Sequence, residues 1–134
     1  MTDTHDVLTD YMQVRRIISR ICLANEDLSK EERVVLASSV GGASSLSSDQ
    51  LRVLIEDTAD MPDIGLLMKN LTQPSQYRQL LIDIAALAII KRDWHEDEMT
   101  AAKQAIAALP FDDAMLSGLN STFDTLRKVS DSLG

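Results

Sequence analysis

Acidic residues crowd into two short segments of this sequence, and the two segments resemble each other. The first, DLSKEE, spans residues 27–32, and the second, DWHEDE, spans residues 93–98. They align without a gap, because Trp94 stands 66 positions after Leu28. Carboxylate oxygens are the ligands that Ca²⁺ and Mg²⁺ take in proteins, and a histidine among them favours a transition metal. Both segments could therefore hold a divalent cation or a basic partner.

The candidate ligands lie in these segments and directly before the first one. They are Glu26, Asp27, Glu31, Glu32, Asp93, His95, Asp97 and Glu98. Neither copy has the alternating acids, central glycine and terminal glutamate of an EF-hand loop, so that kind of site is excluded. Acids in the first turn of a helix also complement the helix dipole, by about 0.3–1 kcal/mol each. Helix capping is therefore the commoner role for such residues, and a histidine at a helix start more often caps than binds metal.

Helix-start signals explain why the acids gather at these two points. Ser29 with Glu32 forms a capping box, and His95 with Glu98 occupies the same positions in the second copy. Trp94 and Met99 stand where a hydrophobic staple would close the second turn. Leu28 corresponds to Trp94, which favours a packing role for the tryptophan. Each acidic segment is therefore predicted to be a turn between two helices.

Apolar residues recur at steps of three and four along most of the chain, which predicts helices throughout. The first helix runs from Val7 to near Ala24, with Arg15, Arg16 and Arg20 mostly outside. A second helix stops at Gly41-Gly42, and a third opens with the Ser47–Gln50 capping box. The sequence shows no alternating strand pattern.

The second half of the chain continues this helical pattern. Pro62 is expected in the first turn of a short helix. The segment 77–91 is apolar almost all round, which predicts a central helix covered on several sides. Further helices end before Pro110 and begin at Asp112 or Asp113, and a break at Asn120-Ser121 would raise their number from seven to eight. The prediction is an all-α, single-domain bundle over 1–134, with repeat halves of about 7–60 and 62–131.

Composition limits the function classes. The chain has 134 residues, 45% hydrophobic and 25% charged, with a formal net charge of −8. Nucleic acid is an unsuitable ligand, because phosphate binding needs clustered Lys and Arg. The longest apolar run, 84–90, is too short to span a bilayer, and the N-terminus lacks a signal-peptide pattern. A soluble cytoplasmic protein is expected, and the single cysteine suits a reducing compartment.

Residues for nucleophilic catalysis are scarce. Cys22 lies at helical spacing from Ile18 on an apolar face, which indicates a buried, inert thiol. The only histidines are His5, near the terminus, and His95 at the second turn. No serine stands in a nucleophile-elbow motif, and Gly41-Gly42 is better explained as a helix end than as a phosphate loop. A catalytic role is therefore the minority interpretation.

The segment 23–33, LANEDLSKEER, resembles the signature of the tellurite-resistance TerB-like family. That family's turn reads roughly Ala-Asp-Gly-x-Ile/Leu-Ser-x-x-Glu, in two copies within an all-helical domain. The resemblance implies a cytoplasmic, stress-associated interaction or metal-sensing module, with cation sites at the turns. This chain departs from the pattern at the family's Asp-Gly pair, which is Asn25-Glu26 in the first copy and Lys91-Arg92 in the second. Basic residues there oppose cation binding.

The leading interpretation is a non-catalytic module whose acidic turns bind a protein partner, or weakly a divalent cation. Both turns would face the same way if the two halves pack about a pseudo-two-fold axis. The alternative is a metal-dependent enzyme acting on a small acidic or phosphorylated ligand. A homodimer through the Ala-rich face of Ala101, Ala105 and Ala108 is a third option, although these small residues also suit the inside of a monomer.

Overall fold

The computed structural model describes residues 10–39 and 46–134, and these form α-helices joined by short turns. The prediction of an all-α bundle is confirmed for this part of the chain. The predicted helix start at Val7 and stop at Gly41-Gly42 lie outside the described residues. The helices are α2 (Asp10–Cys22), α3 (Lys30–Ser39), α4 (Ser48–Asp60), α5 (Ile64–Met68), α6 (Pro74–Ile90), α7 (Glu96–Ala107) and α8 (Asp113–Ser132).

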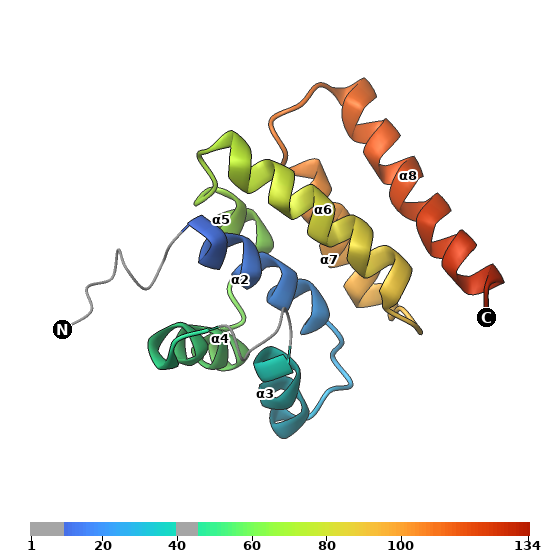
Figure 1. The fold of residues 1–134 in the computed structure, drawn as a ribbon. Helices are drawn as coiled ribbons and strands as arrows, with labels where there is room; N and C mark the ends of the chain where they lie inside the picture. The colour runs from blue at the N-terminus through green and yellow to red at the C-terminus, as the bar shows by residue number, and fades with distance from the viewer. Residues whose placement is uncertain (1–9, 40–45) are drawn as a thin grey trace.

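Helix α2 occupies the middle of the fold. Figure 1 shows α3 and α4 below it and α6 above it, with α8 on the outer side of α6. Val14, Ile17 and Ile21 are fully buried in the main core, to which α5, α6, α7 and α8 also contribute. A separate small core of Met12, Ala37 and Leu54 joins α2 to α3 and α4. The α3–α4 pair is therefore attached to the rest of the fold through one face of α2.

The arginines of α2 are not mostly outside, and that prediction is wrong. Arg16 forms two hydrogen bonds of 2.9 Å, from Nε and Nη2, with the carboxylate of Asp57 in α4. This contact raises the pKa of the Arg16 guanidinium. Arg20 Nε donates to the carbonyl of Pro62 at 2.9 Å, and Arg15 is buried with its guanidinium 4.5 Å from the centre of the Tyr11 ring. Each arginine enters the protein together with a polar or aromatic group.

Helix α6 is rich in apolar residues but is covered on only part of its surface. Leu80, Ile84 and Ala88 are buried against the core. Ile82 and Ile90 are 62% and 75% exposed. The central helix is therefore α2 and not α6, since α2 contacts five other helices. The sequence pattern does not reveal this, because the charged residues of α2 are satisfied by partners far away in the sequence. Among the described residues, no helix combines the length and hydrophobicity needed to cross a bilayer.

One predicted helix boundary is wrong, and the optional break at Asn120-Ser121 does not occur. Pro62 precedes α5 and is not in its first turn, because Asp63 is the N-cap and its side chain accepts from the backbone N–H of Leu66. Helix α8 is continuous through Asn120-Ser121. Its buried Phe123 packs into the main core, so tertiary contacts outweigh the weak helix propensity of Asn and Ser.

Two of the three alanines of the Ala-rich face pack inside the monomer, whereas Ala108, directly after α7, is exposed. Ala101 and Ala105 are buried, and α7 lies against α2 and α5, so these two residues are not available for a dimer contact. Trp94, just before α7, packs edge-on against Phe123 of α8, with ring centroids 5.3 Å apart. The packing role predicted for the tryptophan is confirmed.

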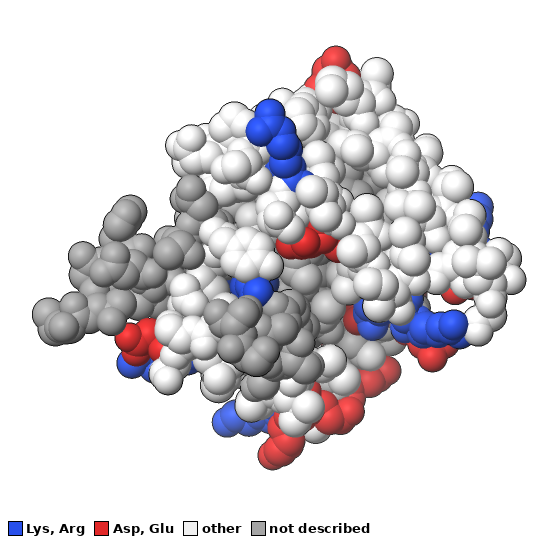
Figure 2. Space-filling view, in the orientation of Figure 1, with Lys and Arg blue, Asp and Glu red and all other residues white. Residues whose placement is uncertain are grey.

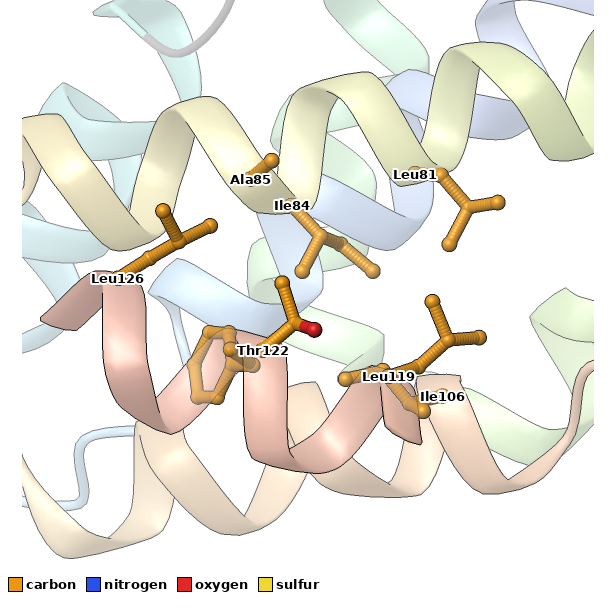
Figure 3. A pocket seen from close by; sticks show the side chains of 8 residues that line it. Leu81, Ile84, Ala85, Ile106, Leu119, Thr122 and Leu126 are labelled. Carbon is orange, nitrogen blue, oxygen red and sulfur yellow. The ribbon is translucent and has the colours of Figure 1, made fainter. Parts of the chain in front are cut away.

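A small apolar cavity remains between α6, α7 and α8. Its volume is about 50 Å³. Figure 3 shows Leu81 and Ile84 of α6 pointing toward Leu119 and Thr122 of α8 across it. Such a space costs dispersion contacts that a larger side chain could recover.

Removal of the Asp57 carboxylate should destabilise the protein strongly. Asp57 is only 4% exposed, and Asp57→Ala leaves the Arg16 guanidinium without its partner. We expect a loss of about 3–5 kcal/mol of unfolding free energy. Asp49→Ala is the matched control on the same helix, because Asp49 pairs with Arg52 in an exposed contact of 3.4 Å worth roughly 0–1 kcal/mol. Urea unfolding would measure both, and equal losses would contradict a structural role for the buried pair.

Filling the α6–α8 cavity should stabilise the fold. Thr122→Ile adds apolar volume at the cavity wall, and we expect a gain of about 0.5–1 kcal/mol. Thr125→Ile makes the same change on α8 at an exposed position that does not line the cavity. Thermal melting should show a higher midpoint for Thr122→Ile than for Thr125→Ile. A lower midpoint for the first variant would mean that the cavity cannot accept the added carbon.

Candidate functional site

The two acidic turns lie beside each other although they are far apart in sequence. One turn joins α2 to α3 and the other joins α6 to α7. The backbone N–H of Glu26 donates to Asp97 Oδ2 at 3.4 Å, and His95 Nε2 lies 3.5 Å from Asp27 Oδ2. The imidazole and carboxylates thus connect the turns directly. Asp27, His95 and Asp97 are the predicted site residues that the fold brings together.

Each turn ends in the predicted capping box. The backbone N–H of Glu32 donates to the Ser29 hydroxyl, and that of Ser29 donates to the Glu32 carboxylate, both at 3.1 Å. The Ser29 hydrogen bonds lower the pKa of Glu32. In the second turn, His95 Nδ1 accepts from the backbone N–H of Asp97 at 3.1 Å, and the N–H of His95 donates to Glu98 at 2.8 Å. Glu32 and Glu98 therefore both cap helices.

The two capping glutamates differ in burial. Glu32 is exposed, whereas Glu98 is only 3% exposed and pairs with Lys91 Nζ at 2.8 Å. The Lys91 ammonium also lies 5.6 Å from the centre of the Trp94 ring. Both oxygens of Glu98 are engaged within the protein, one by His95 and one by Lys91. Glu98 therefore stabilises the second turn.

The remaining candidate acids are exposed to solvent. Glu26, Asp27 and Glu31 are exposed around the first turn and the start of α3. Asp93 is exposed in the second turn and adopts a left-handed backbone conformation with φ 54°, which aspartate tolerates better than most residues. Figure 2 shows acidic side chains gathered along the lower edge of the view, where Figure 1 places α3.

The arrangement of these acids bears on the cation prediction. Within residues 10–39 and 46–134, no group of three or more His, Cys, Asp and Glu side chains is arranged to hold a metal ion. Nδ1 of His95 already accepts a backbone hydrogen bond, so only Nε2 could face a ligand. The cation site at the turns stays a prediction, with Asp27, His95 and Asp97 as its nearest residues.

A groove adjoins the first turn. Its volume is about 410 Å³, and it is lined by Leu28, Glu31, Glu32, Val35 and Leu36. Val35 in this lining is 67% exposed. The lining therefore combines three apolar residues with two glutamates, beside the joined acidic turns.

This groove is not among the features predicted from the sequence, although the sequence carries a signal for it. Val34, Val35 and Leu36 are consecutive in α3, and successive residues of a helix point in directions about 100° apart. Three consecutive apolar residues cannot all face one narrow core. An exposed apolar residue in α3 was therefore predictable, while its position beside Glu31 depended on the fold.

A second cleft, of about 230 Å³, lies between α2 and α6. Tyr11, Arg15 and Asp83 line it together with apolar residues. Burial raises the pKa of Asp83, and the hydrogen bond from Gln79 and the nearby Arg15 guanidinium partly oppose that rise. The cleft thus contains one acidic and one basic side chain among apolar residues.

Comparison of this chain with protein-family models, with curated proteins and with solved structures finds no match. The TerB-like resemblance therefore rests on the two turn motifs alone.

The predicted burial of Cys22 is confirmed, since only 7% of the residue is exposed. Burial raises the pKa of the Cys22 thiol to about 11, with Lys91 lowering it and Glu98 adding to the rise. A thiol in this environment is a poor nucleophile at neutral pH because little of it is ionised.

Cys22 should resist thiol reagents while the protein is folded. At pH 8 a pKa of about 11 leaves far less thiolate than the ordinary value of about 8.5, so we expect labelling to be at least about a hundredfold slower than in guanidinium. Because the folded thiol holds its proton more tightly, its stabilising contribution is complete below about pH 8.5 and is lost as the pH rises toward 11. Absorbance during reaction with a chromogenic disulfide would measure the rates. Similar rates in both conditions would contradict the buried position.

Proposed function

We propose that this chain is a non-catalytic protein-interaction module whose joined acidic turns bind a basic segment of a partner. The observation that supports this most directly is the meeting of Glu26 and Asp27 with His95 and Asp97, residues about 70 positions apart. A joined pair of turns offers a larger acidic surface than either turn alone. The partner would be a protein region rich in Lys or Arg.

Electrostatics favours such a partner. The net charge of −8 attracts basic segments at long range, and the exposed carboxylates of Glu26, Asp27 and Glu31 offer local contacts. Opposite charge across an interface speeds association and fixes orientation more than it adds affinity. The module would therefore bind its partner quickly and with marked dependence on salt.

The resemblance to the TerB-like family adds a setting to the proposal. It suggests a cytoplasmic, stress-associated role related to tellurite resistance, in which a divalent cation at the turns would be a second ligand. Asp27, His95 and Asp97 are the candidate ligands nearest to one another, but no three such side chains of the described residues are arranged to hold a metal ion, so the cation is the weaker proposal. A protein partner is the better supported ligand. The exposed acids Glu26, Asp27 and Glu31 are spread over the surface and are not arranged around a single cation.

The charge of the first turn should determine binding of a basic peptide. We would measure the anisotropy of a fluorescent lysine-rich peptide with the native protein and with the triple variant Glu26→Gln, Asp27→Asn, Glu31→Gln. These side chains are exposed, so the fold should be retained. We expect about tenfold weaker binding at low salt, because three local charge contacts are lost.

A second triple variant separates local contacts from general charge. Asp49→Asn, Glu56→Gln and Asp60→Asn remove the same number of charges from α4, away from the turns. Binding should weaken less than about twofold in this control. Equal weakening in both variants would overturn the proposed surface. Titration with Ca²⁺, Mg²⁺, Mn²⁺ and Zn²⁺ would test the second ligand, and saturable binding lost in Asp97→Asn would favour the cation.

A further inference from the structure

The groove beside the first turn narrows the class of partner. The proposed function requires only a basic segment, whereas the groove also offers an apolar surface. Its apolar lining is Leu28, Val35 and Leu36, and its carboxylates belong to Glu31 and Glu32. We propose that this groove binds an amphipathic helix with a basic polar face, supplied by the partner protein. The inference rests on the proposed function and specifies the shape and chemistry of the segment that binds.

The positions along α3 support a helical partner. Glu31, Glu32, Val35 and Leu36 occupy two successive turns, so carboxylates and apolar side chains share one face of α3. A second helix laid along this face would place apolar residues against Val35 and Leu36. The lysines or arginines of that helix would lay their apolar stems along the groove, and their charged ends would reach the two glutamates. This is the pattern of helix-in-groove recognition.

The exposure of Val35 indicates that the groove has room for an anchor. The residue is 67% exposed, which leaves a large apolar area to be removed from water on binding. The groove, with a volume of about 410 Å³, has room for about two or three aliphatic side chains. A purely electrostatic partner would leave this apolar surface uncovered.

Charge distinguishes this partner from other occupants. A second copy that packed groove against groove would bring Glu31 and Glu32 of both chains together, with like charges opposed. The N-terminal segment 1–9 contains Asp3 and Asp6 and no Lys or Arg, so its charge also opposes the groove. An anionic lipid surface would be repelled for the same reason. A basic amphipathic segment satisfies both the apolar walls and the carboxylates.

The test compares two fluorescent peptides of the same composition, each of about 18 residues, long enough for about five helical turns. In one, leucines recur at steps of three and four and lysines fill the other faces. In the second, the same residues are shuffled so that no apolar face forms. We expect the amphipathic peptide to bind the full chain at least about tenfold more tightly, because only it can bury an apolar face in the groove.

A matched pair of variants locates the contact. Val35→Ser should weaken binding of the amphipathic peptide about tenfold and leave the shuffled peptide unaffected. Ile82→Ser is the control, because Ile82 is similarly exposed, at 62%, on the distant helix α6. The Ile82→Ser variant should bind the amphipathic peptide with the same affinity as the native protein. Circular dichroism would establish that both variants retain their helices.

The outcomes separate this inference from the proposed function. Equal binding of both peptides, with the charge variants of the first turn still weakening it, would overturn the groove and keep the acidic surface. Loss of binding in Ile82→Ser equal to that in Val35→Ser would also overturn the groove. Light scattering that shows a dimer of the protein alone, abolished by Val35→Ser, would assign the groove to a second copy instead. No binding of either peptide would overturn both proposals.

Discussion

The fold depends on satisfying the charges of a helix that is buried on most of its surface. Helix α2 contacts α3, α4, α5, α6 and α7, which leaves little of it in water. An unpartnered guanidinium in such a place would cost several kcal/mol. The bidentate contact of Arg16 with Asp57 and the hydrogen bond of Arg20 to Pro62 remove that cost and also fix where α4 lies. The position of α4 in turn holds α3, and with it the groove and the first acidic turn.

Features set by neighbours in sequence were predictable, and features set by distant partners were not. The capping boxes at Ser29, Ser47 and His95 involve residues three positions apart, and all three form as predicted. The partner of Arg16 is 41 positions away, and no local pattern identifies it. The same limit explains α6, whose apolar character was clear but whose uncovered side, at Ile82 and Ile90, depends on where the other helices pack.

The candidate site follows the same division. The sequence located every acid of the turns and the capping roles of Glu32 and Glu98, but the convergence of the turns was only a conditional expectation. The structure shows that Asp27 and His95 lie 3.5 Å apart. Helices α3 and α7 begin at Lys30 and Glu96, so their starts are separated by the same 66 positions as Leu28 and Trp94. A common origin for the two halves stays a prediction, because similar helix order can arise without duplication.

The two turns have different physical roles despite their similar sequences. In the second turn, Lys91 stands where the first has Asn25, and its ammonium holds Glu98 in a buried pair beneath Trp94. In the first turn, the position aligned with Lys91 holds the uncharged Asn25, and Glu32 is exposed together with Glu31. The tryptophan that covers the second turn is replaced by the smaller Leu28, which lines the open groove. Differences at these two aligned positions thus accompany a buried glutamate in the second turn and an exposed one in the first. Binding should centre on the first turn, with His95 and Asp97 supporting it from the second.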